Sequence, residues 1–224
     1  NMQDANFPQQ VNNGGDFFNN GSTELGMWAN TGSKQTAGWA NFGQNGFGGT
    51  ARNLQVGDTI QITVYASRAY GQIGFSLNAG GTQGSSYANN ISGSRLYVNT
   101  DAYGSWYVGG LSGGSSTASF NYNPTQDISR DYQFKVYITS GSTADVELLV
   151  NGTSQNTLRN LTMGGGSDAE NISALSIYGS DMWDGNSNDN AYWKTSSITD
   201  VGTVNLGYGL TSGTFDPGVV DDGQ

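Results

Sequence analysis

The stretch from Asp58 to Asn78, DTIQITVYASRAYGQIGFSLN, constrains the fold most, because apolar and polar residues alternate in two successive runs. The apolar positions are Ile60, Ile62 and Val64 in the first run, and Ile73, Phe75 and Leu77 in the second. Side chains on a strand point alternately to opposite faces, so this period predicts two half-buried strands. The short polar link predicts that they form a hairpin. Other elements would then pack on or beside this pair.

Further short strands are predicted along the chain, among them residues 94–100, 172–180 and 190–199. Asn151-Gly152 is the strongest hairpin signal, because both residues tolerate the positive φ angles of a tight turn. No window shows an apolar stripe of helical period with a cap. The pattern predicts an all-β fold, an antiparallel two-sheet β-sandwich of the jelly-roll type. We expect a single domain over 1–224, with an irregular N-terminal arm at about 1–23 and a polar C-terminal tail at about 211–224.

Charge and composition exclude several classes of function. The chain has 224 residues, with eight basic and eighteen acidic side chains and a net charge of −10. It therefore repels phosphate backbones and anionic membranes, so we expect no nucleic acid and no membrane insertion. Acidic polysaccharides are disfavoured unless a cation bridges them. Charged residues make up only 12% of the chain, so Asn, Ser, Thr, Gln and Gly supply its polarity, which is typical of secreted bacterial surface proteins.

Several segments together resemble concanavalin A-like, or laminin G-like, jelly rolls of large secreted bacterial proteins. The segments are Ala51–Thr59, Ile73–Leu77, Tyr132–Val136, Val146–Gly152, Ile172–Tyr178 and Asn190–Trp193. The resemblance implies a sandwich that binds carbohydrate or acts in adhesion, often beside a catalytic domain of a longer protein. The E-x-D-x-x-E signature of the related glucanases is missing, and Asp145-Val146-Glu147 is its nearest fragment.

Few residues could support catalysis. The chain has no His and no Cys, which excludes Ser-His-Asp and Cys-His triads, His-ligated zinc and redox cysteines. A glycosidase needs only two carboxyl groups, and the pairs Asp145/Glu147 and Asp168/Glu170 are the candidates. Both pairs are equally explained as solvated, outward-facing carboxylates. We therefore expect a protein that is not an enzyme.

The segment DMWDGNSNDNAYW offers a candidate metal site. Six oxygen-bearing side chains lie within ten residues: Asp181, Asp184, Asn186, Asn188, Asp189 and Asn190. Calcium takes about six to eight oxygen ligands, which flexible Asp and Asn loops supply. The alternative is an Asx-rich turn in which these side chains bond their own backbone. If calcium binds here, its role is structural.

Aromatic residues in loop-like contexts offer a candidate ligand site. Sugars stack on aromatic rings while Asn, Asp and Arg bond their hydroxyl groups. The candidates are Arg68 and Tyr70 at the tip of the central hairpin, Asp101, Tyr103, Trp106 and Tyr107 in DAYGSWY, and Trp183 in the Asp/Asn segment. Trp28, Trp39 and Trp193 lie in strand-like patterns and are predicted to pack in the core or at an edge. Ordinary packing is the competing explanation for each aromatic residue.

These observations favour an extracellular or cell-surface module that binds a neutral polysaccharide or a cell-surface glycan without catalysis. One alternative is a self-assembling subunit of a surface layer or filament, in which a terminal segment adds a strand to a neighbouring sheet. Another is a polysaccharide-cleaving enzyme that uses the carboxylate pairs. Neither the glycan nor the assembly state follows from the sequence.

Overall fold

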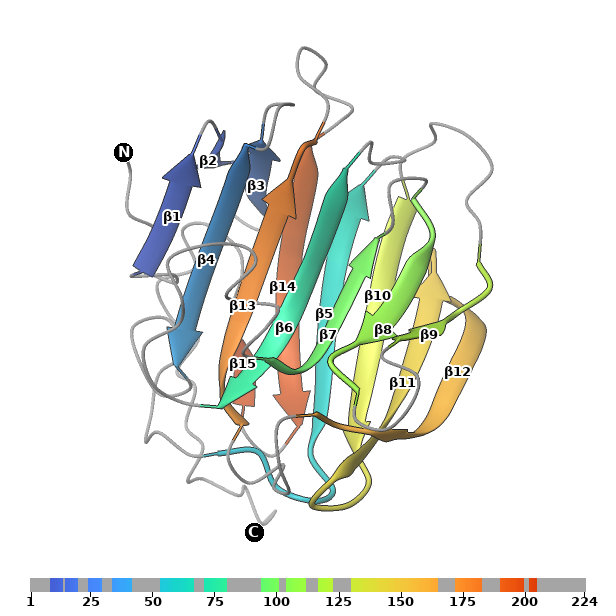
Figure 1. Cartoon of the computed structure of the whole chain (residues 1–224). Helices are drawn as coiled ribbons and strands as arrows, with labels where there is room; N and C mark the ends of the chain where they lie inside the picture. Colours follow the sequence, from blue (N-terminus) through green and yellow to red (C-terminus); the bar gives the residue numbers. More distant parts are fainter. Residues whose placement is uncertain are drawn as a thin grey trace, which may run out of the picture.

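The computed structural model describes residues 9–13, 15–19, 24–29, 34–41, 53–66, 71–79, 94–100, 104–111, 117–122, 130–164, 172–182, 190–199 and 202–204. These residues form two antiparallel sheets that pack face to face as two layers (Figure 1). The predicted all-β jelly-roll sandwich is confirmed. No helix long and apolar enough to cross a membrane occurs among the described residues.

The first sheet has seven strands. Their order is β1 (Gln9–Asn13), β4 (Gln35–Asn41), β13 (Ile172–Ser180), β6 (Gln72–Ala79), β7 (Ser94–Thr100), β8 (Trp106–Gly109) and β9 (Thr117–Ser119). Every strand pair in it is antiparallel. Strands β13, β6 and β7 form the middle of the front layer in Figure 1.

The second sheet has eight strands. Their order is β12 (Thr153–Thr162), β11 (Thr143–Val150), β10 (Arg130–Ile138), β5 (Thr59–Ala66), β14 (Ala191–Thr199), β3 (Glu24–Ala29) and β2 (Gly15–Asn19), and β15 (Gly202–Val204) pairs with β14. Strand β5 lies between β10 and β14, so neighbours occupy both of its edges.

The predicted hairpin between residues 58 and 78 is wrong, although both of its strands exist. Strand β5 belongs to the eight-stranded sheet, and β6 belongs to the seven-stranded sheet, between β13 and β7. The two strands therefore face each other across the core instead of pairing side by side. An alternating apolar face fits either arrangement, because it specifies which side is buried and not which strand is the neighbour.

Aromatic rings from both sheets fill the space between them. Phe75 of β6 meets Phe134 of β10 at a ring-centroid distance of 5.6 Å, and Trp106 of β8 meets the same ring at 4.7 Å. All three side chains are almost fully buried. Trp193 is also fully buried, as predicted from its strand pattern. Burial of each large side chain contributes roughly 1.5–3 kcal/mol, so these rings hold the two layers together.

The Asn151-Gly152 hairpin is confirmed. Val150 of β11 pairs with Thr153 of β12, and the two residues between them have φ angles of 48° and 80°. Both angles lie in the left-handed region, which glycine and asparagine adopt at low cost. The Asn151 side-chain oxygen also accepts a hydrogen bond of 3.0 Å from the backbone N–H of Asp131, which ties the turn to β10.

A double-mutant cycle tests the placement of β6 opposite β10. We expect Phe75→Ala and Phe134→Ala each to cost about 3–5 kcal/mol of unfolding free energy. The pair should show a coupling of about 0.5–1.5 kcal/mol in denaturant unfolding, because the rings touch. The control cycle combines Phe75→Ala with Tyr137→Phe on the outer face of the other sheet and should be additive. Additivity in the Phe75/Phe134 cycle would contradict the facing arrangement.

Candidate binding surfaces

The described strand ends that flank the predicted ligand and metal residues lie at one end of the sandwich, at the top of Figure 1. Strand β5 ends at Ala66, which pairs with Arg130 at the start of β10 and with Ala191 at the start of β14. On the other sheet, Ser180 at the end of β13 pairs with Gln72 at the start of β6. The strand ends on either side of the predicted segments therefore converge there.

Most of the predicted side chains themselves lie outside the described residues. These are Arg68, Tyr70, Asp101, Tyr103, Trp183, Asp184, Asn186, Asn188 and Asp189, together with the carboxylates Asp168 and Glu170. Trp106, Tyr107, Asp181 and Asn190 are described, as are Asp145 and Glu147.

Trp106 is not available to a ligand. The sequence suggested a loop tryptophan, but the residue begins β8, and its side chain points into the core with 1% of its surface exposed. It packs on Tyr132 at 5.2 Å and on Phe134 at 4.7 Å between ring centroids. The prediction that Trp106 stacks on a sugar is therefore wrong, because the start of the strand fixes its inward direction.

Tyr107 points the opposite way, onto the outer face of the seven-stranded sheet, and is half-buried. Its hydroxyl oxygen accepts a hydrogen bond of 3.1 Å from the side-chain amide of Asn99 on β7. Its ring meets Tyr97 edge-on, with centroids 6.1 Å apart and planes at 81°. Two tyrosines on neighbouring strands therefore form a platform on this outer face, which we call the Tyr97–Tyr107 platform.

Glycine makes this platform possible. Gly109 of β8 pairs directly with Tyr97 of β7, and a Cβ atom at Gly109 would collide with the Tyr97 ring. The ring therefore lies on the backbone of β8. Burial raises the pKa of Tyr97, and the neighbouring Tyr107 raises it further. The Tyr97 hydroxyl consequently keeps its proton at neutral pH and can donate a hydrogen bond.

The same outer face carries a buried polar cluster beside the platform. Ser76 of β6 pairs with Tyr97 on one side and with Ser176 of β13 on the other. The Asn78 amide donates to the hydroxyls of Ser76 at 2.9 Å and Ser176 at 3.1 Å. Sequence reasoning missed this face, although its signal was present: the polar positions of the second alternating run, Ser76 and Asn78 among them, lie here, opposite the core.

Two of the six candidate calcium ligands, Asp181 and Asn190, are described. Asp181 follows β13 with a φ of 51°, and its backbone N–H donates to the carbonyl of Lys34 at 2.9 Å. Asn190 precedes β14 and is half-buried. No group of three or more acidic, His or Cys side chains gathers within the described ranges. The calcium site remains a prediction that rests on residues outside those ranges.

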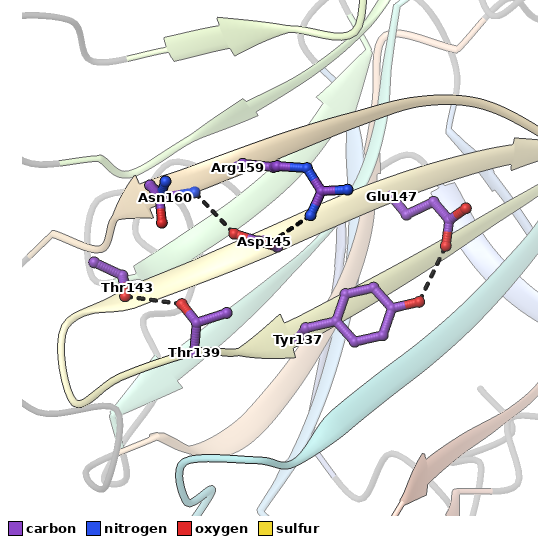
Figure 2. A network of polar contacts seen from close by, with 7 residues as sticks. All are labelled: Tyr137, Thr139, Thr143, Asp145, Glu147, Arg159 and Asn160. Carbon is purple, nitrogen blue, oxygen red and sulfur yellow. Dashed lines mark hydrogen bonds and ion pairs between the residues drawn. The ribbon is translucent and has the colours of Figure 1, made fainter.

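The carboxylates Asp145 and Glu147 lie on the outer face of the eight-stranded sheet and already have partners (Figure 2). Asp145 accepts a hydrogen bond from the backbone of Asn160 at 2.8 Å and pairs with Arg159 at 3.3 Å. Glu147 accepts one from the Tyr137 hydroxyl at 3.0 Å. The Asp145 contacts clamp the β-bulge where residues 159 and 160 oppose a single residue of β11. These contacts stabilise the bulged edge of the sheet.

No protein-family model and no curated protein matches this sequence. Among solved structures, a Bacillus subtilis protein of unknown function with a galectin-like fold matches with a TM-score of 0.52. The two sequences are 11% identical, over 85% of this chain and 87% of that one. Endo-beta-1,4-glucuronan lyase from the fungus Trichoderma reesei matches with a TM-score of 0.50 and 9% identity, over 86% and 90% of the two chains. The potassium-bound Emp46p carbohydrate recognition domain matches with a TM-score of 0.47 and 12% sequence identity, over 89% of this chain and 88% of that one.

The first two likenesses show the fold. The chain is a galectin-like, concanavalin A-like jelly roll, as the resemblance noted in the sequence implied.

Alkaline titration tests the environment of the buried and partly buried tyrosines. Burial raises the pKa of Tyr97, Tyr132 and Tyr137 above 10.0, and the hydrogen bond to Glu147 raises that of Tyr137 further. A raised pKa in the folded state means that stability is complete below pH 10 and falls as pH rises through the folded-state values. Denaturant unfolding along an alkaline series should show this loss, and Tyr137→Phe should reduce it. An unchanged pH profile in Tyr137→Phe would contradict the assignment.

Proposed function

We propose that this chain is a non-catalytic carbohydrate-binding module that takes neutral glycans on the outer face of the seven-stranded sheet. The observation that carries the proposal is the Tyr97–Tyr107 platform, in which two half-buried rings lie on a sheet and are not needed for the core. Aromatic faces of this kind stack on sugar rings, and the Tyr97 hydroxyl is a protonated donor for a sugar oxygen. The fold, which is shared with a glucuronan lyase, supports a carbohydrate ligand.

The absence of catalysis is supported by the state of the described groups that could perform it. A tyrosine acting as a base at neutral pH needs a lowered pKa, and the pKa of Tyr97 is raised. The Asp145 and Glu147 carboxylates are held by Arg159 and Tyr137. We propose an extracellular or cell-surface location, on the grounds of composition, because uncharged polar residues supply the polarity of the chain.

Self-assembly through strand addition is the second candidate. The edge strands β1 and β2 pair with their neighbours over five residues each without a register shift, whereas the other described edges give strand addition little support. Strand β12 is interrupted by two register shifts against β11, and bulges of this kind turn an edge away from a partner strand. Strands β9 and β15 have three residues each. An edge this short or irregular is a poor template for a neighbouring chain.

Binding to soluble neutral polysaccharides tests the main proposal. We expect isothermal titration with β-glucan, xylan and galactan to identify a ligand whose affinity falls about tenfold in Tyr97→Ala, since the loss of an aromatic contact costs ~0.5–1.5 kcal/mol and 1.4 kcal/mol is tenfold. Gly109→Ala should weaken binding similarly by displacing the ring. The matched control is Tyr65→Ala, an exposed tyrosine of the opposite sheet, which should bind normally.

Equal binding by the wild type, Tyr97→Ala and Tyr107→Ala would contradict the platform. Chromatography of the same mixtures checks catalysis. Release of oligosaccharide products would overturn the non-catalytic proposal, and full retention of that activity in Glu147→Gln would exclude the Asp145/Glu147 pair as its source.

Thermal unfolding with EDTA or with added calcium tests the proposed structural calcium. An ion that binds only the folded state adds about 2.7 kcal/mol of stability at a hundred times its dissociation constant. We expect calcium to raise the unfolding midpoint and Asp184→Asn to remove that shift. Asp145→Asn, whose carboxylate lies on the outer face of the other sheet, should retain it. No shift in the wild type would favour an Asx-rich turn without metal.

A further inference from the structure

Arg130 occupies an unusual position at the loop end of the sandwich. It begins β10, and alternate residues of that strand, from Tyr132 to Ile138, point into the core with at most 2% of their surface exposed. Arg130 is two residues before Tyr132 and so lies on the same, inward side of the strand. It pairs with Ala66, which is itself a core residue. Its side chain is therefore an inward-facing guanidinium at the mouth of the core, and it is half-buried.

One hydrogen-bond donor of Arg130 has no acceptor. The Nη1 atom of Arg130 is buried and has no hydrogen-bond partner. Burial raises the pKa of the Tyr132 hydroxyl, and the nearby Arg130 side chain opposes this shift. Arg130 therefore presents a buried donor without an acceptor.

No carboxylate in the described part of the chain pairs with Arg130. Asp131, the next residue, points to the outer face and binds Lys194 at 2.7 Å. Arg159 in contrast has Asp145. Arg95 donates from its Nη1 to the carbonyl of Gly164 at 3.3 Å, although its Nε atom is also buried without a partner. Leaving a buried charged donor unsatisfied costs at least ~1–3 kcal/mol. In a chain with a net charge of −10, this unpaired cation is unexpected on grounds of stability alone.

We propose that Arg130 is an anion-recognition residue that binds the carboxylate of an acidic ligand at the loop end of the sandwich. The planar guanidinium matches a carboxylate with two parallel hydrogen bonds. The ligand carries this carboxylate on a sugar acid or is a free small carboxylate. The site is separate from the Tyr97–Tyr107 platform, since Arg130 lies between the sheets and the platform lies on an outer face.

The acidic net charge of the chain limits which anions can bind at Arg130 but does not prevent binding of a small one. Long polyanions are repelled by the whole chain, as the sequence predicted. A single carboxylate interacts mainly with groups within the Debye length, about 8 Å at physiological salt, and at the proposed site Arg130 would be in direct contact with it. We therefore expect recognition of an isolated acidic unit and not of a uniformly acidic polymer.

Sodium glucuronate and glucose form a matched pair of probes, because they differ in a carboxylate at one carbon. Thermal unfolding at constant ionic strength should show a midpoint that rises with glucuronate and not with glucose or sodium chloride. Sodium acetate separates the two sources of the carboxylate: a rise with acetate equal to that with glucuronate indicates a general carboxylate site, and a larger rise with glucuronate indicates a sugar acid. Arg130→Gln should lose the response, and Arg130→Lys should retain part of it.

Stability without ligand separates recognition from a structural role. If Arg130 serves a ligand, Arg130→Met should fold with unchanged or raised stability, because a buried cation without a partner is removed. The control Arg159→Gln should keep the full glucuronate response. An Arg130→Gln protein that responds like the wild type, or an equal response to chloride, would overturn the proposal. The glycan binding of Tyr97→Ala is independent of these outcomes.

Discussion

Contact between aromatic rings of the two sheets is the interaction on which the rest of the structure depends. Phe134 of β10 is touched by Phe75 from β6, by Trp106 from β8 and by Phe120, which lies just beyond β9, so one ring joins three places on the opposite layer. Packing of this kind requires that alternate residues of each strand, the apolar ones, point inward along its whole length. Once the inner faces are fixed, the outer faces carry the remaining side chains.

This division explains why neighbouring residues have different roles. Trp106 and Tyr107 are adjacent, yet one is a core residue and the other belongs to the outer platform. Arg130 and Asp131 are divided in the same way, between the mouth of the core and an ion pair with Lys194. The inward position suits Trp106 and is costly for Arg130, and a costly position is where a functional role is the better explanation.

Sequence reasoning reached the fold and the strands because alternation is a local signal that each strand carries by itself. It failed for features that depend on which strands pair with each other. Residues 60–64 and 73–77 were correctly identified as strands, but nothing in them says that β5 pairs with β10 and β14 instead of β6. Trp106 was assigned to a loop because glycine and serine precede it, whereas its pairing with Thr100 makes it the first residue of β8. The Tyr97–Tyr107 platform was missed for the same reason, since it joins two strands.

Three carboxylates on the outer face of the eight-stranded sheet have partners. There Asp145 is matched by Arg159, Asp131 by Lys194 and Glu147 by the Tyr137 hydroxyl. Partly exposed pairs of this kind contribute little stability each, but they hold these three carboxylates in fixed positions. Within the described ranges the Arg130 guanidinium has no such carboxylate partner, and it is where we propose that an anion binds. The proposed glycan stacking and the proposed carboxylate recognition would therefore lie on different parts of the sandwich, the first on an outer face and the second at the opening between the sheets.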